Sequence, residues 1–137
     1  MEKLLKNYLA SQGCKMTKQR KAILDVLSNS NTCMSAEEIY SKVKTIRSST
    51  CLTTVYRTID LLASKNLLNK IDLGDNRYRY EINTDLHHHH IICLECKKIV
   101  CLEGCPVEEF EKTVGTKTDF KITGHRLELY GYCSDCK

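Results

Sequence analysis

The sequence predicts an α+β fold in two parts, and three observations lead to this prediction. Within residues 1–82, three stretches carry apolar residues at helical spacing, and an alternating stretch follows them. Charge divides at the same point: residues 1–82 hold 14 Lys and Arg against 8 Asp and Glu, a net charge of +6, whereas residues 83–137 have a net charge of −2. All five histidines and six of the nine cysteines lie in the second part. A basic segment suited to polyanions therefore precedes a segment suited to metal.

The three predicted helices cover residues 17–28, 35–46 and 53–66. Thr17 is a suitable N-cap for the first, and Ser35 begins a capping box before the second. In each stretch the apolar residues recur every three or four positions, so each helix has one face suited to a core.

A β-hairpin is predicted after the third helix. Asn66 is a candidate left-handed C-cap, and the stretch LLNKIDLGDNRYRYEI then alternates around a Gly-Asp-Asn turn. Three short helices followed by a hairpin describe a winged helix-turn-helix. In that fold the second helix of the motif enters the major groove of DNA, and the hairpin forms the wing.

The second part is predicted to be a small α+β domain, with strands at 87–94, 98–102 and 120–131 and a helix at 106–117. The polar segment NTDL separates the two parts as a hinge. The predicted boundaries are 1–82 for the winged helix, 83–86 for the hinge and 87–137 for the second domain.

The chain is expected to be cytoplasmic. It has no apolar run near the roughly eighteen residues of a membrane span, and its N-terminus MEKLLKNYLASQG lacks the apolar core of a signal peptide. In a reducing compartment, nine cysteines indicate metal ligands or reactive thiols rather than a disulfide framework.

Two Cys-x2-Cys pairs, Cys93 with Cys96 and Cys133 with Cys136, offer four thiolates. Four thiolates suit tetrahedral zinc with no open coordination position, and such closed sites are structural. A gap of 36 residues separates the two pairs, so the intervening strand, helix and strand must bring them together. This zinc is expected to tie the last strand to the first.

The run HHHH at residues 87–90 lies on a predicted strand, where side chains alternate between faces. His87 and His89 should therefore point one way and His88 and His90 the other. Two metal sites on opposite faces fit this pattern better than one site with four histidines.

Six stretches of the chain occur together in a characteristic order: KMTKQRKAIL, SAEEIY, TTVYRTIDLL, RYRYEI, HHHHIICLEC and GHRLELYGYCSDC. With them the chain resembles the ferric uptake regulator family of bacterial metal-dependent repressors. The resemblance implies a homodimer in which the winged helix reads double-stranded DNA and the second domain dimerises. It also implies that metal at the hinge sets the orientation of the two domains, and that the four paired cysteines hold structural zinc.

Two further metal sites follow from the resemblance. The hinge sensing site of the family falls on Cys33, Glu81, His88, His90 and Cys101. An additional site of many members falls on His87, His89, Glu108 and His125.

The hinge residues favour zinc as the sensed metal. Iron-sensing members usually carry histidine at position 33 and a carboxylate at position 101, whereas this chain has Cys33 and Cys101. Soft thiolates favour tetrahedral zinc over iron(II), which indicates a zinc-uptake regulator. An iron(II)-responsive or a peroxide-responsive regulator is the alternative, since either cysteine could instead be a buried apolar residue with Glu81 completing a different set. Cys105 is a further thiol without an assigned role.

DNA contacts are expected from the third predicted helix, from the segment before the first and from the wing. Tyr56 can contact a thymine methyl group, and Arg57 can pair with a phosphate or a guanine edge. In the family, a residue matching Lys15 enters an A/T-rich minor groove, so the expected operator is an A/T-rich palindrome. The candidate DNA-binding residues are Lys15, Gln19, Arg20, Thr53, Thr54, Tyr56, Arg57 and Arg77.

An enzyme is the competing class, either a zinc hydrolase or a thiol oxidoreductase. A hydrolase needs an open zinc position beside a general base, and an oxidoreductase needs a thiol of low pKa beside a cation. The sequence has no HExxH motif, and neither Cys-x2-Cys pair precedes an evident helix. A regulator is therefore predicted, and a DNA-binding adaptor with purely structural zinc is the remaining alternative.

Overall fold

The computed structural model describes residues 2–30, 32–83 and 87–137 and divides into two compact units, Met1–Thr84 and Asp85–Lys137. Of the predicted hinge, residues 84–86 lie outside the described residues. The order of elements confirms the predicted α+β class. Among the helices of the described residues, none has the length and apolar character that a bilayer span requires.

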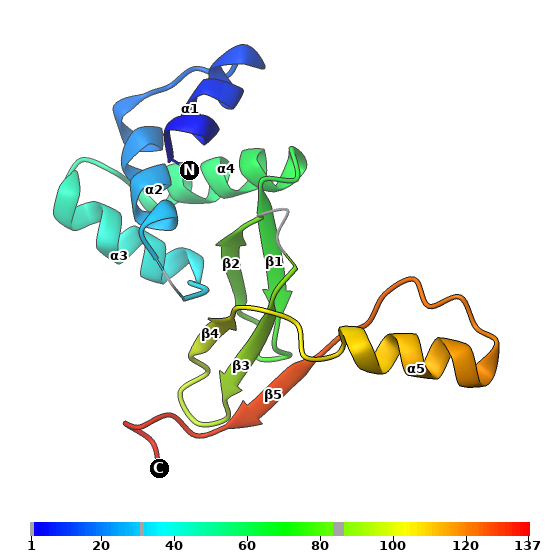
Figure 1. Cartoon of the computed structure of the whole chain (residues 1–137). Coiled ribbons are helices and arrows are strands. Elements are labelled where there is room, and N and C mark those ends of the chain that lie inside the picture. Colours follow the sequence, from blue (N-terminus) through cyan, green and yellow to red (C-terminus); the bar gives the residue numbers. More distant parts are fainter. Residues whose placement is uncertain (1, 31, 84–86) are drawn as a thin grey trace. The chain divides into compact units, whose positions relative to one another are not determined.

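Unit 1 contains a cluster of helices followed by a two-stranded antiparallel sheet (Figure 1). Its elements are α1 (Glu2–Ser11), α2 (Lys18–Ser28), α3 (Ala36–Ile46), α4 (Leu52–Ser64), β1 (Leu68–Asp72) and β2 (Tyr78–Ile82). Thr17 and Ser35 cap α2 and α3, because each hydroxyl oxygen accepts a hydrogen bond from the backbone N–H three residues later. This sequence of helices and hairpin is that of the predicted winged helix-turn-helix.

Helix α1 is the element of unit 1 that lies outside the predicted helices and hairpin. Leu5 and Leu9 are buried in the core, whereas Leu4 is 73% exposed. Two leucines four residues apart lie on one helix face, and this short signal was present in the sequence. The helix packs against α2, and it ends in a turn where Gly13 has a φ of 75° and the Cys14 N–H donates to the Leu9 carbonyl over 3.0 Å.

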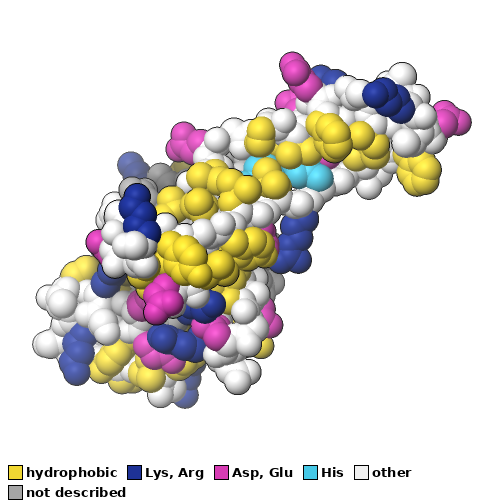
Figure 2. Space-filling model, turned by 90° about the horizontal axis from the view of Figure 1, so that it is seen from below, with side chains coloured by type: hydrophobic (Ala, Val, Ile, Leu, Met, Phe, Trp, Pro, Cys, Tyr) yellow, Lys and Arg dark blue, Asp and Glu magenta, His cyan; other side chains and the backbone are white. Residues whose placement is uncertain are grey.

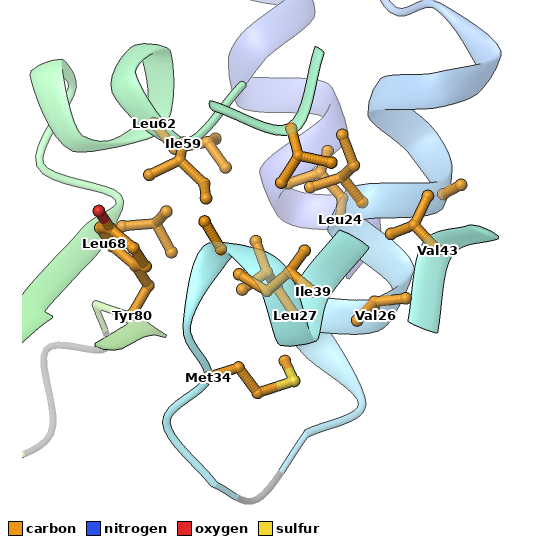
Figure 3. Packing of buried hydrophobic residues seen from close by; sticks show 14 of the residues in the cluster. Leu24, Val26, Leu27, Met34, Ile39, Val43, Ile59, Leu62, Leu68 and Tyr80 are labelled. Atoms are coloured by element: carbon orange, nitrogen blue, oxygen red, sulfur yellow. The ribbon is translucent and has the colours of Figure 1, made fainter. Parts of the chain in front are cut away.

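The core of unit 1 lies between the helices and the hairpin. Figure 3 shows Leu24, Ile39 and Ile59 pointing toward one another from α2, α3 and α4. Tyr80 of β2 and Leu68 of β1 close the side toward the sheet. This core holds α4 by one face and leaves its other face accessible.

Replacing Ile39 by alanine is expected to lower the free energy of unfolding of unit 1 by about 2–5 kcal/mol, because Ile39 is fully buried. The matched control is Ile46→Ala in the same helix, where the side chain is 62% exposed. The control should change stability by about 0.5 kcal/mol or less. Urea unfolding followed by far-ultraviolet circular dichroism measures both, and equal losses would contradict the assignment of the core.

The wing is an antiparallel hairpin that pairs Leu68 with Ile82 and Asp72 with Tyr78. Asn66 has a φ of 58°, which confirms the predicted left-handed cap, and Gly74 has a φ of 77° in the turn. Met34 extends this sheet, because its N–H and carbonyl both bond to Tyr80 at 3.0 and 2.7 Å. The segment before α3 is thereby fixed beside β2.

Unit 2 contains a three-stranded sheet with strand order β4-β3-β5 (Figure 1). Its elements are β3 (His89–Cys93), β4 (Ile99–Leu102), α5 (Glu108–Thr118) and β5 (Glu128–Gly131). Strand β3 pairs antiparallel with β4 and parallel with β5. Helix α5 has no buried residue, and Figure 1 shows it apart from the three strands.

The predicted strand 120–131 is wrong over most of its length, because β5 covers only Glu128–Gly131. These four residues pair with His90–Cys93, and β3 begins only one residue earlier. Among the described residues, those before Leu127 therefore lie beyond the start of β3, and alternation alone could not predict where pairing ends.

Candidate metal centres and nucleic-acid interface

The two Cys-x2-Cys pairs come together at one end of the sheet of unit 2. Strand β5 runs parallel to β3, and Gly131 lies opposite Cys93. The segments that follow the two strands therefore leave the sheet at the same end. All four sulfur atoms, those of Cys93, Cys96, Cys133 and Cys136, lie within 4.8 Å of one another. The parallel pairing of β3 and β5 thus brings together two cysteine pairs that are separated by 36 residues in the sequence.

The thiols of this cluster differ in acidity. The backbone N–H of Cys133 donates to the Cys93 sulfur over 3.4 Å, and with a backbone hydrogen bond from Cys96 it lowers the pKa of Cys93 to about 6. Hydrogen bonding to Cys133 raises the pKa of Cys136 to about 12. Four neighbouring thiolates need a cation to offset their charge, and tetrahedral zinc accepts four such ligands. The donor set therefore fits a closed zinc site.

The histidine run divides between two faces, as the alternation of a strand predicts. The rings of His87 and His89 have centroids 4.5 Å apart, and those of His88 and His90 are 5.0 Å apart. One run of four residues thus supplies two separate pairs of imidazoles.

The first pair joins a cluster formed wholly within unit 2. The ligand atoms of His87, His89, Cys105 and His125 lie within 4.8 Å of one another. The resemblance had put Glu108 in this group, but its carboxylate instead lies 3.6 Å from the ammonium group of Lys112. Among the described residues, Cys105 takes the place expected for the carboxylate.

Glu111 is a second residue of this cluster that is not among the predicted ligands. Its Oε1 lies 2.5 Å from the Nδ1 of His125. Glu111 is three residues after Glu108 and hence on nearly the same face of α5, so helical spacing could have identified it. Burial, followed by the nearby His87 and His125, lowers the pKa of His89 and favours the neutral imidazole, which is the form that binds metal.

In unit 1, Cys33 and Glu81 form a buried pair. The Cys33 thiol donates to Oε2 of Glu81 over 3.3 Å, and Asn69 donates to its other oxygen over 3.3 Å. The bridge between Met34 and Tyr80 determines this contact, because the residues flanking it lie side by side. Cys33 and Glu81 are only 5% and 9% exposed, which is unusual for a carboxylate.

In unit 2, His90 lies directly opposite Cys101 in the register of β3 and β4. Both residues are partly buried. Of the five residues predicted for the hinge site, unit 1 thus brings two together, and unit 2 brings together the other three, His88, His90 and Cys101.

Helix α4 presents candidate DNA contacts on the face opposite its core residues. Thr53, Tyr56 and Arg57 are exposed and Thr54 is partly exposed, whereas Val55 is buried. Because one face is fixed to the core, these side chains point outward as a group.

Two polar contacts position other candidate residues. The Tyr56 hydroxyl donates to Glu37 over 3.0 Å, which raises the pKa of Tyr56. Arg77 of the wing lies 3.2 Å from Ser35 and 3.9 Å from Glu37. The wing and the start of α3 are thus linked to the exposed face of α4.

The segment before α2 carries the remaining candidates. Lys15 is exposed, and Gln19 and Arg20 are partly exposed. The Arg20 guanidinium donates to the backbone carbonyl of Lys15 over 2.6 Å. Arg20 therefore holds the backbone at Lys15, whose own side chain extends into solvent.

Comparisons with known proteins show what this chain is similar to. A model of the Ferric uptake regulator family matches residues 11–130. The ferric uptake regulation protein of Campylobacter upsaliensis is 36% identical over 133 residues, which cover 96% of this chain and 85% of that protein. The peroxide-responsive repressor PerR of Staphylococcus aureus strain USA300 is 34% identical over 129 residues, covering 94% and 86%. A solved zinc-bound manganese uptake regulator superposes with a TM-score of 0.84 at 29% identity, covering 94% of this chain and 98% of that chain.

Proposed function

Because this chain belongs to the ferric uptake regulator family of metal-dependent transcription regulators, we propose that it is a repressor of metal-homeostasis genes that responds to zinc. The observation that carries the proposal is that each unit by itself brings together two residues of the proposed ligand set. Cys33 and Glu81 meet within the winged helix, and His90 and Cys101 are paired within the second unit. We propose that a single cation binds both pairs, together with His88.

Such a cation would couple the orientation of the winged helix to that of the dimerisation unit. A nearly complete switch between two arrangements needs about 5.5 kcal/mol of differential binding. Zinc bound by structural sites in small peptides contributes roughly 10–16 kcal/mol. A sensing site is therefore sufficient for a switch if its zinc-binding free energy differs between the two arrangements by only part of this amount.

The choice of zinc rests on the chemistry of the donors. Cys33 and Cys101 supply soft sulfur ligands, and His88 and His90 supply imidazoles. This combination suits tetrahedral zinc, whereas carboxylate-rich sites suit manganese and iron(II). Relatives named for iron uptake and for the peroxide response are similar to this chain at nearly equal identity, so the comparisons favour no branch.

The four paired cysteines are proposed to hold a second, structural zinc, and unit 2 is proposed to form the dimer. Exposed apolar side chains support the dimer, since unit 2 carries several that a second copy of the chain could cover. These side chains are Leu94 (44% exposed), Phe110 (66%), Phe120 (72%), Leu129 (45%), Tyr130 (60%) and Tyr132 (59%).

For DNA reading, we propose that α4 enters the major groove and that Lys15 reaches the adjacent minor groove. Thr53, Tyr56 and Arg57 on the exposed face of α4 are the base-reading candidates. Thr54, Gln19, Arg20 and Arg77 are the supporting contacts to the backbone of the duplex. A dimer presents two such helices, which matches a palindromic operator.

Replacing Arg57 by alanine is expected to weaken operator binding by about 1–3 kcal/mol, or roughly 5- to 150-fold, because a base or phosphate contact is lost. Lys42→Ala is the control, since Lys42 is an exposed cation on α3 that the proposal assigns to the solvated surface. Fluorescence anisotropy with labelled duplex DNA measures both. Equal losses would show that the basic surface acts through charge alone.

The function is tested by selecting binding sequences from a random duplex library, once with zinc and once with a chelator. An A/T-rich palindrome should be enriched only with zinc. Operator affinity is then measured at buffered free concentrations of zinc, iron(II) and manganese under anaerobic conditions. Activation by iron(II) at a lower free concentration than zinc would refute the choice of metal, and enrichment of no sequence in either selection would refute the repressor.

A further inference from the structure

The cluster of His87, His89, Cys105 and His125 differs in its donors from the carboxylate-containing site that the family resemblance implied. We propose that Cys105 is a metal ligand here, so that three imidazoles and one thiolate form a zinc-binding site, and that Glu111 positions His125 within it. This site lies within unit 2 and does not depend on DNA binding or on the hinge.

The geometry of the nitrogen atoms supports a bound cation. The Nε2 of His125 lies 2.9 Å from Nε2 of His87 and 3.2 Å from Nε2 of His89. Either contact can be a hydrogen bond when one of its two nitrogens carries the proton, but the Nε2 of His125 has only one lone pair or one proton to offer to both neighbours. A cation can instead accept the lone pairs of all three nitrogens, and neutral imidazole is a common ligand for divalent transition metals.

The Cys105 sulfur completes this group. It lies 3.5 Å from Nε2 of His89 and 3.3 Å from Nε2 of His125. With four donors from four residues, the set has the number and types of ligand that tetrahedral zinc takes in closed sites. Because thiolate is softer than the carboxylate it replaces, the site should prefer zinc or cobalt(II) over manganese.

Glu111 determines which nitrogen of His125 faces the cluster. The Nδ1–H of His125 donates to Oε1 of Glu111 over 2.5 Å, which leaves the lone pair on Nε2. A carboxylate that holds the second nitrogen of a ligating histidine fixes the tautomer and increases the basicity of the ring. Glu111 is therefore a positioning residue rather than a ligand.

The site also connects elements that share little other packing. Helix α5 has no buried residue, yet Cys105 precedes it and Glu111 lies in its first turn. His89 belongs to β3 and is 4% exposed, whereas His87 is exposed, so the site has a buried base and an accessible entrance. Figure 2 shows histidine side chains at the surface beside hydrophobic side chains. Metal binding should therefore fasten the start of α5 to the sheet.

The test uses cobalt(II) as a spectroscopic probe in the full chain, with zinc kept in the four-cysteine cluster. A Cys33→Ser, Cys101→Ser background removes the thiolates of the proposed hinge site. Cobalt(II) should then give the intense visible bands of tetrahedral coordination and a sulfur-to-cobalt charge-transfer band. Cys105→Ser should remove the charge-transfer band, and Cys105→Asp should restore binding without it.

Glu111→Gln should weaken cobalt(II) and zinc binding by about 10- to 100-fold while keeping the charge-transfer band. Glu109→Gln is the matched control on the same helix and should change nothing. Hydrogen exchange in residues 105–118 should slow when zinc is added to the background protein, and Cys105→Ser should abolish that protection.

The proposal is overturned if the charge-transfer band persists in Cys105→Ser. It is also overturned if Glu108→Gln weakens cobalt(II) binding and Cys105→Ser does not, since the carboxylate would then be the ligand. These readouts use no DNA, so their failure is distinct from failure of the proposed repressor function.

Discussion

A variant with Cys33, His88 and His90 all replaced by alanine is expected to lose metal-dependent DNA binding while remaining folded and dimeric. Cys33 belongs to unit 1 and the two histidines to unit 2, so the changes remove ligands from both sides of the proposed hinge site. Allosteric coupling between two ligands is typically about 1–3 kcal/mol, or roughly 5- to 150-fold in affinity. In the variant, operator affinity should be the same with zinc and with a chelator. Fluorescence anisotropy measures this ratio directly.

The matched control for this variant is Cys14→Ala. Cys14 is a partly buried cysteine of unit 1 that packs against the core and belongs to none of the three proposed metal sites. The control should retain the full response to zinc. Sedimentation of both proteins tests that the dimer persists. An unchanged zinc response in the triple variant would exclude the hinge site as the sensor.

Replacing Cys136 by serine is expected to release the structural zinc and unfold the sheet of unit 2. The four sulfurs lie where β3 and β5 end. Losing one ligand therefore removes the only metal site that is proposed to link these two strands. Structural zinc contributes roughly 10–16 kcal/mol in small peptides, which is as large as the whole stability of a typical domain, about 5–15 kcal/mol. Native mass spectrometry should find about one zinc fewer per chain, and sedimentation should find a monomer.

Ser134→Ala is the control for the cysteine change, because Ser134 is exposed in the same turn and is not a ligand. It should retain both zinc and dimer. Unit 1 should keep its helical circular dichroism in both variants, since its core lies within residues 1–84. A Cys136→Ser protein that remained a zinc-containing dimer would contradict the structural role of the cluster.

Local patterns in the sequence were sufficient to predict most of unit 1. Thr17, Ser35 and Asn66 each act at the helix end where their side chains predict a cap. The hairpin register follows from alternation around the turn at Gly74. Helix α1 was missed because its core-facing signal consists of two leucines and because Gly13, which ends it with a φ of 75°, was not predicted to end a helix.

In the candidate sites too, features that follow from local spacing were predicted and features that depend on the path of the chain were not. Spacing along one strand predicts that His87 and His88 belong to different faces, and the ring contacts agree. The position of Cys105 depends on a loop and on the path of the chain back to His125, and neither has a periodic signal. Family resemblance pointed to Glu108 instead, because such a comparison transfers positions and does not show which side chains lie together in this chain.

The most direct test of coupling between cation and DNA is the zinc affinity of the protein measured with and without operator DNA. The protein carries Cys105→Ser to remove the second cluster, and a competing chelator reports zinc at the hinge site. Binding free energies are reciprocal, so operator DNA should raise zinc affinity by the same factor by which zinc raises operator affinity. Equal zinc affinities with and without DNA would contradict the coupling and would leave the protein a DNA-binding adaptor with structural metal only.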